Sequence, residues 1–136
     1  MPLNQSRDTR KLAQAEHRDL PVAAGVKIFQ GALVVMAAGL VRPGRVAAGD
    51  VAIGRAVQEA DNSAGAAGAL MCRMDTGTFK FRNATAGDAL TLADIGSTCF
   101  VLDDDQVAKT NPGGNTRSVA GRVWNVEADG VWVTIA

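Results

Sequence analysis

Three consecutive carboxylates, Asp103, Asp104 and Asp105, come closest to a reactive site in this sequence. Clustered carboxylate oxygens are the ligands that hard cations such as Ca²⁺ prefer. Along an extended backbone, alternate side chains point to opposite faces, so we expect the middle carboxylate to turn away from its neighbours. No D-x-[DN]-x-[DN]-G calcium-loop pattern follows the run. The sequence therefore favours a solvated turn here, and we predict no metal site.

Nucleophilic and acid–base catalysis lack their usual components. The only histidine, His17, lies in a polar stretch where no rigid scaffold is expected to orient it as a base. Asp94 and Glu127 would act as an acid–base pair only if the fold joined them in a cleft. A hydrolase or metal-dependent enzyme, the least favoured of three functional readings, would need a cleft joining Asp94, Asp103 and Asp105. We predict no catalytic residues and no enzymatic activity.

Cofactor binding has no sequence support either. The two cysteines, Cys72 and Cys99, stand apart in apolar segments, whereas zinc sites need three or four ligands. Neither G-x-x-x-x-G-K-[ST] nor G-x-G-x-x-G after a strand occurs, so no phosphate-binding loop is indicated. We predict two small buried thiols, kept reduced in a protein that is not exported, and no cofactor.

The composition predicts a folded protein with a thin core. The chain has 136 residues, the size of one domain, with 47% hydrophobic and 21% charged residues. Much of the apolar share is Ala and Val, with four Phe, two Trp and no Tyr. Small side chains bury little area each, at roughly 25 cal/mol per Å². We therefore expect burial to be completed by other subunits.

Charge and hydropathy argue against two classes of partner. Fourteen basic and fourteen acidic residues give a formal net charge of +0, so no overall field attracts nucleic acid or anionic lipid. No run approaches the roughly 20 apolar residues that span a bilayer, and the polar start lacks the apolar stretch of a signal peptide. We predict no nucleic-acid partner and no membrane association.

Residues 1–18 differ in composition from the rest and are predicted to form an N-terminal arm. The arm carries Arg7, Arg10, Lys11 and Arg18 but few apolar residues. Its stretch from Thr9 to His17 has fair helix propensity, although so short a helix is marginal in water without a packing partner. We expect the arm to be flexible, or to be ordered by whatever it binds.

Residues 19–136 are predicted to form a single β-rich domain. Short β-branched segments separated by Gly, Pro, Asn and Asp are typical of a small antiparallel β-sandwich or barrel, here with an extended N-terminal arm. Gly54, inside an apolar segment, indicates a bulge or a close backbone approach. The expected strands are 26–29, 32–36, 40–42, 51–57, 70–74, 78–82, 98–102, 117–126 and 131–135.

Turn residues and alternation add detail to this domain. Asp75-Thr76-Gly77 predicts a hairpin between the strands at 70–74 and 78–82, and Asp129-Gly130 predicts one between the last two strands. Alternation places Phe79 and Phe81 on one face. By the same rule, Lys80 and Arg82 share the other face, and Val131, Val133 and Ile135 point away from Trp132 and Thr134. Residues 93–96 are expected to form one helical turn or a bend.

The ordered motifs of the chain resemble a known family of small phage proteins. The stretches that carry the resemblance are Leu20–Val34, Asp61–Gly68, Leu92–Asp104, Thr116–Val123 and Gly130–Val133. They are similar to proteins encoded beside the major capsid gene of tailed bacteriophages and Mu-like prophages, the head decoration, cement or minor capsid proteins. The resemblance covers residues from about 20 to the end. The individual motifs are rich in Gly and Ala, so its specificity comes from the order in which they follow one another along the chain.

The resemblance implies a structural role rather than a catalytic one. It implies a β-rich domain that sits on the outside of an icosahedral shell, commonly as a homotrimer, and bridges neighbouring major capsid subunits to stabilise the mature head. It also implies a location on the outer capsid surface, after assembly in the host cytoplasm. The alternative is a virion-displayed adhesion or receptor-binding module that uses the loops at 61–68 and 111–115.

The candidate interface residues lie in the N-terminal arm and in the last two predicted strands. Arg and Trp are enriched at protein interfaces, yet each could equally cover its own sheet. We select Arg7, Arg10, Lys11, Arg18, Arg117, Arg122, Trp124 and Trp132. The arm is expected to become ordered on the capsid surface, where it could add a strand to a sheet edge.

Overall fold

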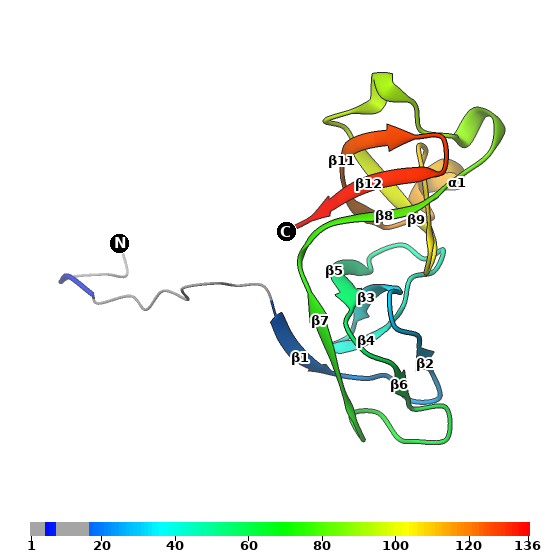
Figure 1. Cartoon of the computed structure of the whole chain (residues 1–136). Helices are drawn as coiled ribbons and strands as arrows, with labels where there is room; N and C mark the ends of the chain where they lie inside the picture. Colours follow the sequence, from blue (N-terminus) through cyan, green and yellow to red (C-terminus); the bar gives the residue numbers. More distant parts are fainter. Residues whose placement is uncertain (1–4, 8–16) are drawn as a thin grey trace.

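The computed structural model describes residues 5–7 and 17–136, and it places a five-stranded sheet beside a small closed barrel (Figure 1). The predicted all-β class is confirmed. The strands are β1 (His17–Pro21), β2 (Lys27–Ile28), β3 (Leu33–Ala37), β4 (Leu40–Pro43), β5 (Val51–Ala56), β6 (Ala60–Asp61), β7 (Met71–Asp75), β8 (Gly77–Asn83), β9 (Thr98–Asp103), β10 (Gln106–Ala108), β11 (Val119–Glu127) and β12 (Gly130–Ile135). The helical turns are η1 (Ala86–Asp88), η2 (Leu92–Asp94) and α1 (Pro112–Asn115).

The five-stranded sheet has the order β1-β7-β5-β3-β4, and every neighbouring pair in it is antiparallel. Its outer strands approach each other, because a parallel bridge joins Val22, just after β1, to Val41 of β4. Small and medium apolar side chains fill the concave side, among them Val34, Ile53 and Met74. The short β2–β6 ribbon packs beside this sheet.

The barrel is closed in the order β10-β8-β12-β11-β9. All of its pairs are antiparallel except β8 with β10, which is parallel. Phe79 and Phe81 both point into the core, where their rings meet edge to face with centroids 6.5 Å apart. Val131, Val133 and Ile135 are buried from the neighbouring strand, so the predicted alternation is confirmed on β8 and β12.

Strand β3 belongs to both cores. Leu33 and Val35 pack with the barrel residues, whereas Val34, on the opposite face of the strand, packs inside the five-stranded sheet. The Leu33 amide also donates a hydrogen bond of 2.7 Å to the carbonyl of Asp104, in the turn between β9 and β10. The sheet and the barrel are therefore packed against each other through alternate residues of one strand.

The predicted hairpin at Asp75-Thr76-Gly77 is wrong. β7 pairs with β1 and β5, while β8 pairs with β12 and β10, so the chain passes directly from the sheet into the barrel. At the crossing the backbone of Asp75 lies against Gly54, where an added Cβ would be only 2.0 Å from the Asp75 carbonyl oxygen. The close approach predicted for Gly54 is confirmed, with a register shift in the adjoining β3–β5 ladder.

The arm is shorter than predicted at its C-terminal end. His17 and Arg18 belong to β1, where they pair with Asp75 and Met74. The edge of β7 offers them backbone hydrogen bonds that a sequence pattern does not reveal. The predicted helical stretch at 9–16 lies outside the described residues.

Several local expectations agree with the structure. The single helical turn is η2, with a capping box in which the Thr91 side chain accepts from the Asp94 backbone and the Asp94 side chain accepts from the Thr91 amide. The β11–β12 hairpin closes at Glu127 and Gly130. The strand predicted from 117 begins at Val119.

Among the described residues there is no helix that is both long and apolar enough to cross a membrane.

Candidate interaction surface

Trp124 is presented to solvent by a β-bulge on the outer face of the barrel. In the β11–β12 ladder Val123 pairs with Val133 and Asn125 pairs with Trp132, which leaves Trp124 as the extra residue. An extra residue bends its strand and redirects a side chain. Trp124 is 63% exposed, and no hydrogen bond or ring contact holds its side chain within the part of the chain described.

Trp132 shares this face but is held in place. Its indole N–H donates to the Glu127 carboxylate, and the Lys80 ammonium lies 5.8 Å from the centre of its ring. Lys80 is fixed in turn by Asp129, whose carboxylate is 2.5 Å from the ammonium and raises the pKa of Lys80. The two indoles therefore differ, because one is anchored by neighbouring charges and the other is free.

Two hollows flank Trp124 on this outer face. One, of about 420 Å³, is lined by Thr78, Trp124 and Trp132. The other, of about 410 Å³, lies towards Ile95 and Arg122. The Arg122 guanidinium donates two hydrogen bonds, of 3.2 and 2.9 Å, to the Gly96 carbonyl. We call the surface formed by Thr78, Ile95, Arg122, Trp124, Trp132 and Thr134 the Trp124 face.

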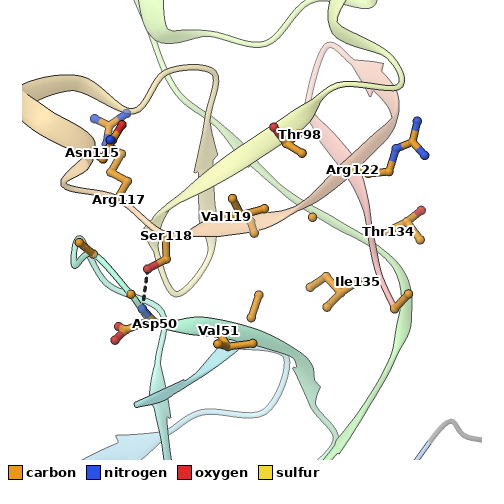
Figure 2. A pocket seen from close by; sticks show the side chains of 16 residues that line it. Asp50, Val51, Thr98, Asn115, Arg117, Ser118, Val119, Arg122, Thr134 and Ile135 are labelled. Carbon is orange, nitrogen blue, oxygen red and sulfur yellow. Dashed lines mark hydrogen bonds between the residues drawn. The ribbon is translucent and has the colours of Figure 1, made fainter. Parts of the chain in front are cut away.

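A second apolar surface is a groove of about 700 Å³ between the sheet and the barrel (Figure 2). Val51 at the start of β5 and Val119 at the start of β11 line it while remaining 58% and 48% exposed. Ala52, Ala120 and Ile135 contribute further apolar surface. We call this feature the inter-sheet groove, and define it by Val51, Ala52, Val119, Ala120, Ile135 and Ala136.

Arg117, predicted as an interface residue, is used inside the molecule. It precedes β11, and its Nη1 donates to the Asp88 carboxylate at 2.8 Å and to the Thr110 carbonyl at 2.9 Å. Partial burial opposes ionisation of Asp88, but hydrogen bonds from Thr110 and Arg117 outweigh it and lower the pKa of that carboxyl. Arg117 thus fixes the loop after β10 against the barrel.

The arm residues selected from the sequence are only partly described. Arg7 is exposed, as are its neighbours Gln5 and Ser6, and Arg18 is exposed on β1. Arg10 and Lys11 lie outside the described residues. The structure therefore brings Arg122, Trp124 and Trp132 together on one face, and it places Arg117 and Arg18 elsewhere.

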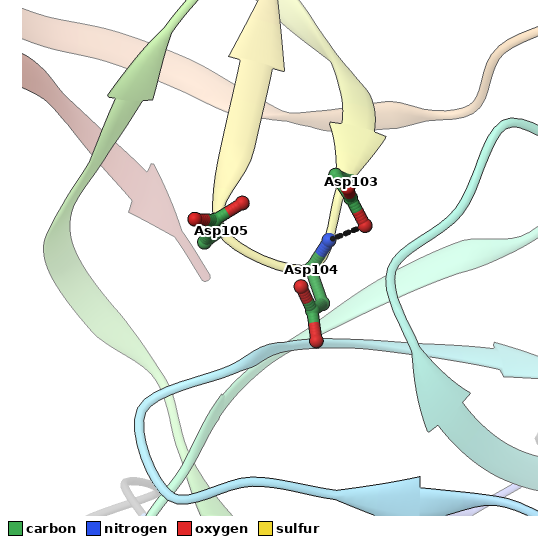
Figure 3. Close-up of side chains that lie close together, drawn as sticks. All are labelled: Asp103, Asp104 and Asp105. Carbon is green, nitrogen blue, oxygen red and sulfur yellow. Dashed lines mark hydrogen bonds between the residues drawn. The ribbon is translucent and has the colours of Figure 1, made fainter.

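The three consecutive aspartates form a tight turn between β9 and β10 (Figure 3). The expectation that Asp104 would point away from its neighbours is wrong, since one carboxylate oxygen from each residue lies within 4.8 Å of the others. Asp104 and Asp105 occupy the turn itself, so the alternation of an extended strand does not apply to them.

The carboxylates of this turn have contacts that suit a structural role. The Asp105 carboxylate accepts two hydrogen bonds from Arg82, at 2.8 and 3.0 Å, which lower its pKa. Asp103 accepts from the Asp104 amide at 2.8 Å. Burial, with the charges of Asp103 and Asp105, raises the pKa of Asp104. Backbone carbonyls of the same turn bond Leu33 and Arg82, so the turn connects sheet and barrel.

The other acidic candidates are held apart from this turn. The Asp94 carboxylate caps η2 by accepting from the Thr91 amide at 2.7 Å, and lies 3.7 Å from the Lys109 ammonium. Glu127 binds the indole of Trp132. Among the described residues, the three-carboxylate cluster consists of Asp103, Asp104 and Asp105 without Asp94.

The loop at 61–68 is built around a buried amide. Asn62 is buried, and its side-chain nitrogen donates to the carbonyls of Val22, Ala23 and Ala66 at 3.4, 2.9 and 2.9 Å. An added Cβ on Gly65 would lie 2.0 Å from the Asn62 side-chain oxygen, so the loop needs glycine there. The segment at 111–115 is mostly exposed, with Gly113 and Gly114 at positive φ.

Sequence reasoning missed the inter-sheet groove. Val51 and Val119 each stand in a segment predicted as a strand, and that pattern does not indicate their exposure. Their exposure depends on where β5 and β11 meet in space, for which no local signal exists.

Comparisons with known protein families, curated proteins and solved structures find no match to this chain.

Proposed function

We propose that the protein is a bacteriophage head decoration, or cement, protein that binds the outer surface of the capsid as a homotrimer and bridges neighbouring major capsid subunits. The ordered motifs from Leu20 to Val133 support this role through their resemblance to that family. The observation that carries the proposal is the free indole of Trp124, which a bulge holds out from an otherwise well-packed barrel.

The Trp124 face has the properties of an interface centre. A tryptophan buries roughly 150–250 Å² when covered, so burying the exposed part of this indole is worth about 3 kcal/mol. Arg122 lies beside it, and tryptophan and arginine are the residues that most often dominate binding energy. Trp132, already fixed by Glu127, adds rigid surface at little entropic cost.

Binding to the shell would stabilise the mature head by mass action. A ligand that binds one state of a lattice and not the other shifts the balance by about 2.7 kcal/mol per site at a concentration of 100 times its Kd. The protein must therefore bind the expanded shell more tightly than the precursor shell. Contacts that span two capsid subunits supply this difference, because expansion changes the spacing of the subunits.

The test measures occupancy of capsids assembled from the major capsid protein that the proposal makes its partner. Purified protein is added to mature heads that lack it, and bound copies are counted after sedimentation. Trp124→Ala is expected to weaken binding at least tenfold, as expected for an interface hot spot. Phe29→Ala, which removes another exposed aromatic ring just after β2, is the matched control.

Both variants should unfold at the temperature of the unmodified protein, because both side chains are largely exposed. The same measurement on precursor shells gives the affinity difference that the mechanism needs. Unchanged occupancy by Trp124→Ala would remove the Trp124 face from the proposal. Absence of binding by the unmodified protein would overturn the function itself.

A further inference from the structure

The inter-sheet groove leaves two β-branched side chains uncovered. Val51 and Val119 are 58% and 48% exposed, whereas most other valines of the strands are fully buried. Figure 2 shows Val119 and Ile135 on the barrel side of the groove and Val51 on the sheet side. Ile135 is already buried, so an apolar side chain placed in the groove would cover mainly Val51 and Val119.

An open strand edge runs along the sheet side of the groove. β5 pairs with β7 only at Arg55 and Ala56, so among the described residues Val51, Ala52 and Ile53 have no strand partner on that side. Unpaired strand edges accept an extended segment through backbone hydrogen bonds. The groove therefore offers both apolar walls and backbone donors and acceptors to an extended peptide.

The N-terminal segment leaves the body beside this groove. His17 pairs with Asp75, and Ile135, which lines the groove, pairs with Gly77, only two residues further along the same stretch of chain. Sixteen residues precede His17. Fully extended, they span about 50 Å, enough to reach the same groove on an adjacent copy.

The composition of residues 8–16 suits the groove. Leu12 is the one large apolar side chain in this stretch, and it is followed by the small residues Ala13 and Ala15. Because side chains alternate along a strand, Leu12 would face Val51 and Val119, which line the groove, while Ala13 and Ala15 would point to the other face and add little bulk there. The charged residues before Leu12 would lie at the rim, in contact with water.

The described part of the arm favours a second copy as the source of this segment. Gln5, Ser6 and Arg7, the described residues that precede this stretch, are all exposed, so none of them is buried against its own sheet or barrel. The exit point and the groove are repeated on every copy, so exchange of arms around a rotation axis can close into a ring.

We propose that residues 8–16 of one copy bind in the inter-sheet groove of a second copy as an added strand along β5, with Leu12 packed between Val51 and Val119. This inference deepens the self-association included in the proposed function. It leaves residues 1–7, with Arg7, beyond the groove and available to the shell.

Cysteine cross-linking between two preparations tests the contact directly. A Leu12→Cys chain is mixed with a Val119→Cys chain under mild oxidation, the native thiols being buried. A covalent dimer of the two chains is expected, whereas Leu12→Cys mixed with Phe29→Cys, at an exposed position after β2 that does not line the groove, should give none. A disulfide formed only within a single chain carrying both changes would show that the arm occupies its own groove, and would overturn the proposal.

The mass of the free protein provides the second measurement. The unmodified chain is expected to be an oligomer, and deletion of residues 1–16, which keeps β1 intact, should give a monomer. Leu12→Asp should do the same, and Leu3→Asp, outside the docked stretch, should not. If the shortened chain still formed an oligomer with the same number of copies, the inference would be overturned. Because no capsid is present, this result is independent of whether the protein binds shells.

Discussion

The hydroxyl of Ser118 joins the barrel to the five-stranded sheet through Asp50. Its oxygen accepts a hydrogen bond from the Asp50 backbone amide at 2.9 Å, and its proton is donated to the Ala47 carbonyl at 2.6 Å. Both Ser118 and Asp50 are buried. This single side chain therefore fixes one end of the inter-sheet groove (Figure 2).

Replacing Ser118 with alanine should destabilise the protein by about 1–3 kcal/mol, because the buried Asp50 amide loses its acceptor. Chemical denaturation measures the change. Ser97→Ala, at an exposed serine just before β9, is the control and should alter stability by less than about 0.5 kcal/mol. Equal stability of the two variants would show that the hydroxyl does not join the two parts of the fold.

Gly54→Ala should disrupt the crossing between β7 and β8. The new Cβ would lie 2.0 Å from the Asp75 carbonyl oxygen, which is backbone and cannot rotate away. We expect a loss of more than about 2 kcal/mol or a failure to fold. At Gly87 an added Cβ has no neighbour within 4 Å, so Gly87→Ala should cost little. A Gly54→Ala variant of normal thermal stability would contradict the close approach.

Both cysteines should be unreactive in the folded protein. Burial raises the pKa of Cys99 to about 12 and also raises the pKa of Cys72. The thiolate is the reactive form, so little of it exists at pH 8 in the native state. Titration with a thiol reagent at pH 8 should detect two thiols in denaturant and almost none without it. Rapid reaction of one native thiol would show an accessible cysteine.

The free energy of unfolding that the Asp88 carboxylate contributes should decrease as the pH falls. Its folded pKa lies below the ordinary value of 3.8, so its contribution is full above that pH and is lost as the pH falls through the lower, folded value. Asp88→Asn should cost about 1–2 kcal/mol at pH 7 through weakened contacts with Arg117 and Thr110.

The difference between this variant and the unmodified protein should shrink below about pH 4, as denaturation curves at successive pH values would show. Glu59→Gln is the control, since the contact of Glu59 within the described residues is an exposed ion pair with Lys27. A constant difference from pH 7 to pH 2 would mean that the charge on Asp88 has no part in stability.

Features determined by neighbouring residues were predictable from the sequence. The alternation of Phe79 and Phe81 with Lys80 and Arg82 identified the buried face of β8, and Asp129-Gly130 located the last hairpin. Gly54 marked a close backbone approach without indicating which segment approaches. The acidic run was recognised as a turn, but its carboxylates came closer than strand geometry predicts, because a turn brings successive side chains together.

The sequence by itself determined the all-β class, the strand faces, two buried thiols and a short supply of large apolar side chains. Only the tertiary structure decided that β7 and β8 separate into different sheets, that a bulge exposes Trp124, and that Val51 and Val119 border one groove. The physical reason is the distance along the chain over which each interaction acts. Side-chain alternation and turn preference act over a few residues, whereas strand pairing depends on edges supplied by segments distant along the chain.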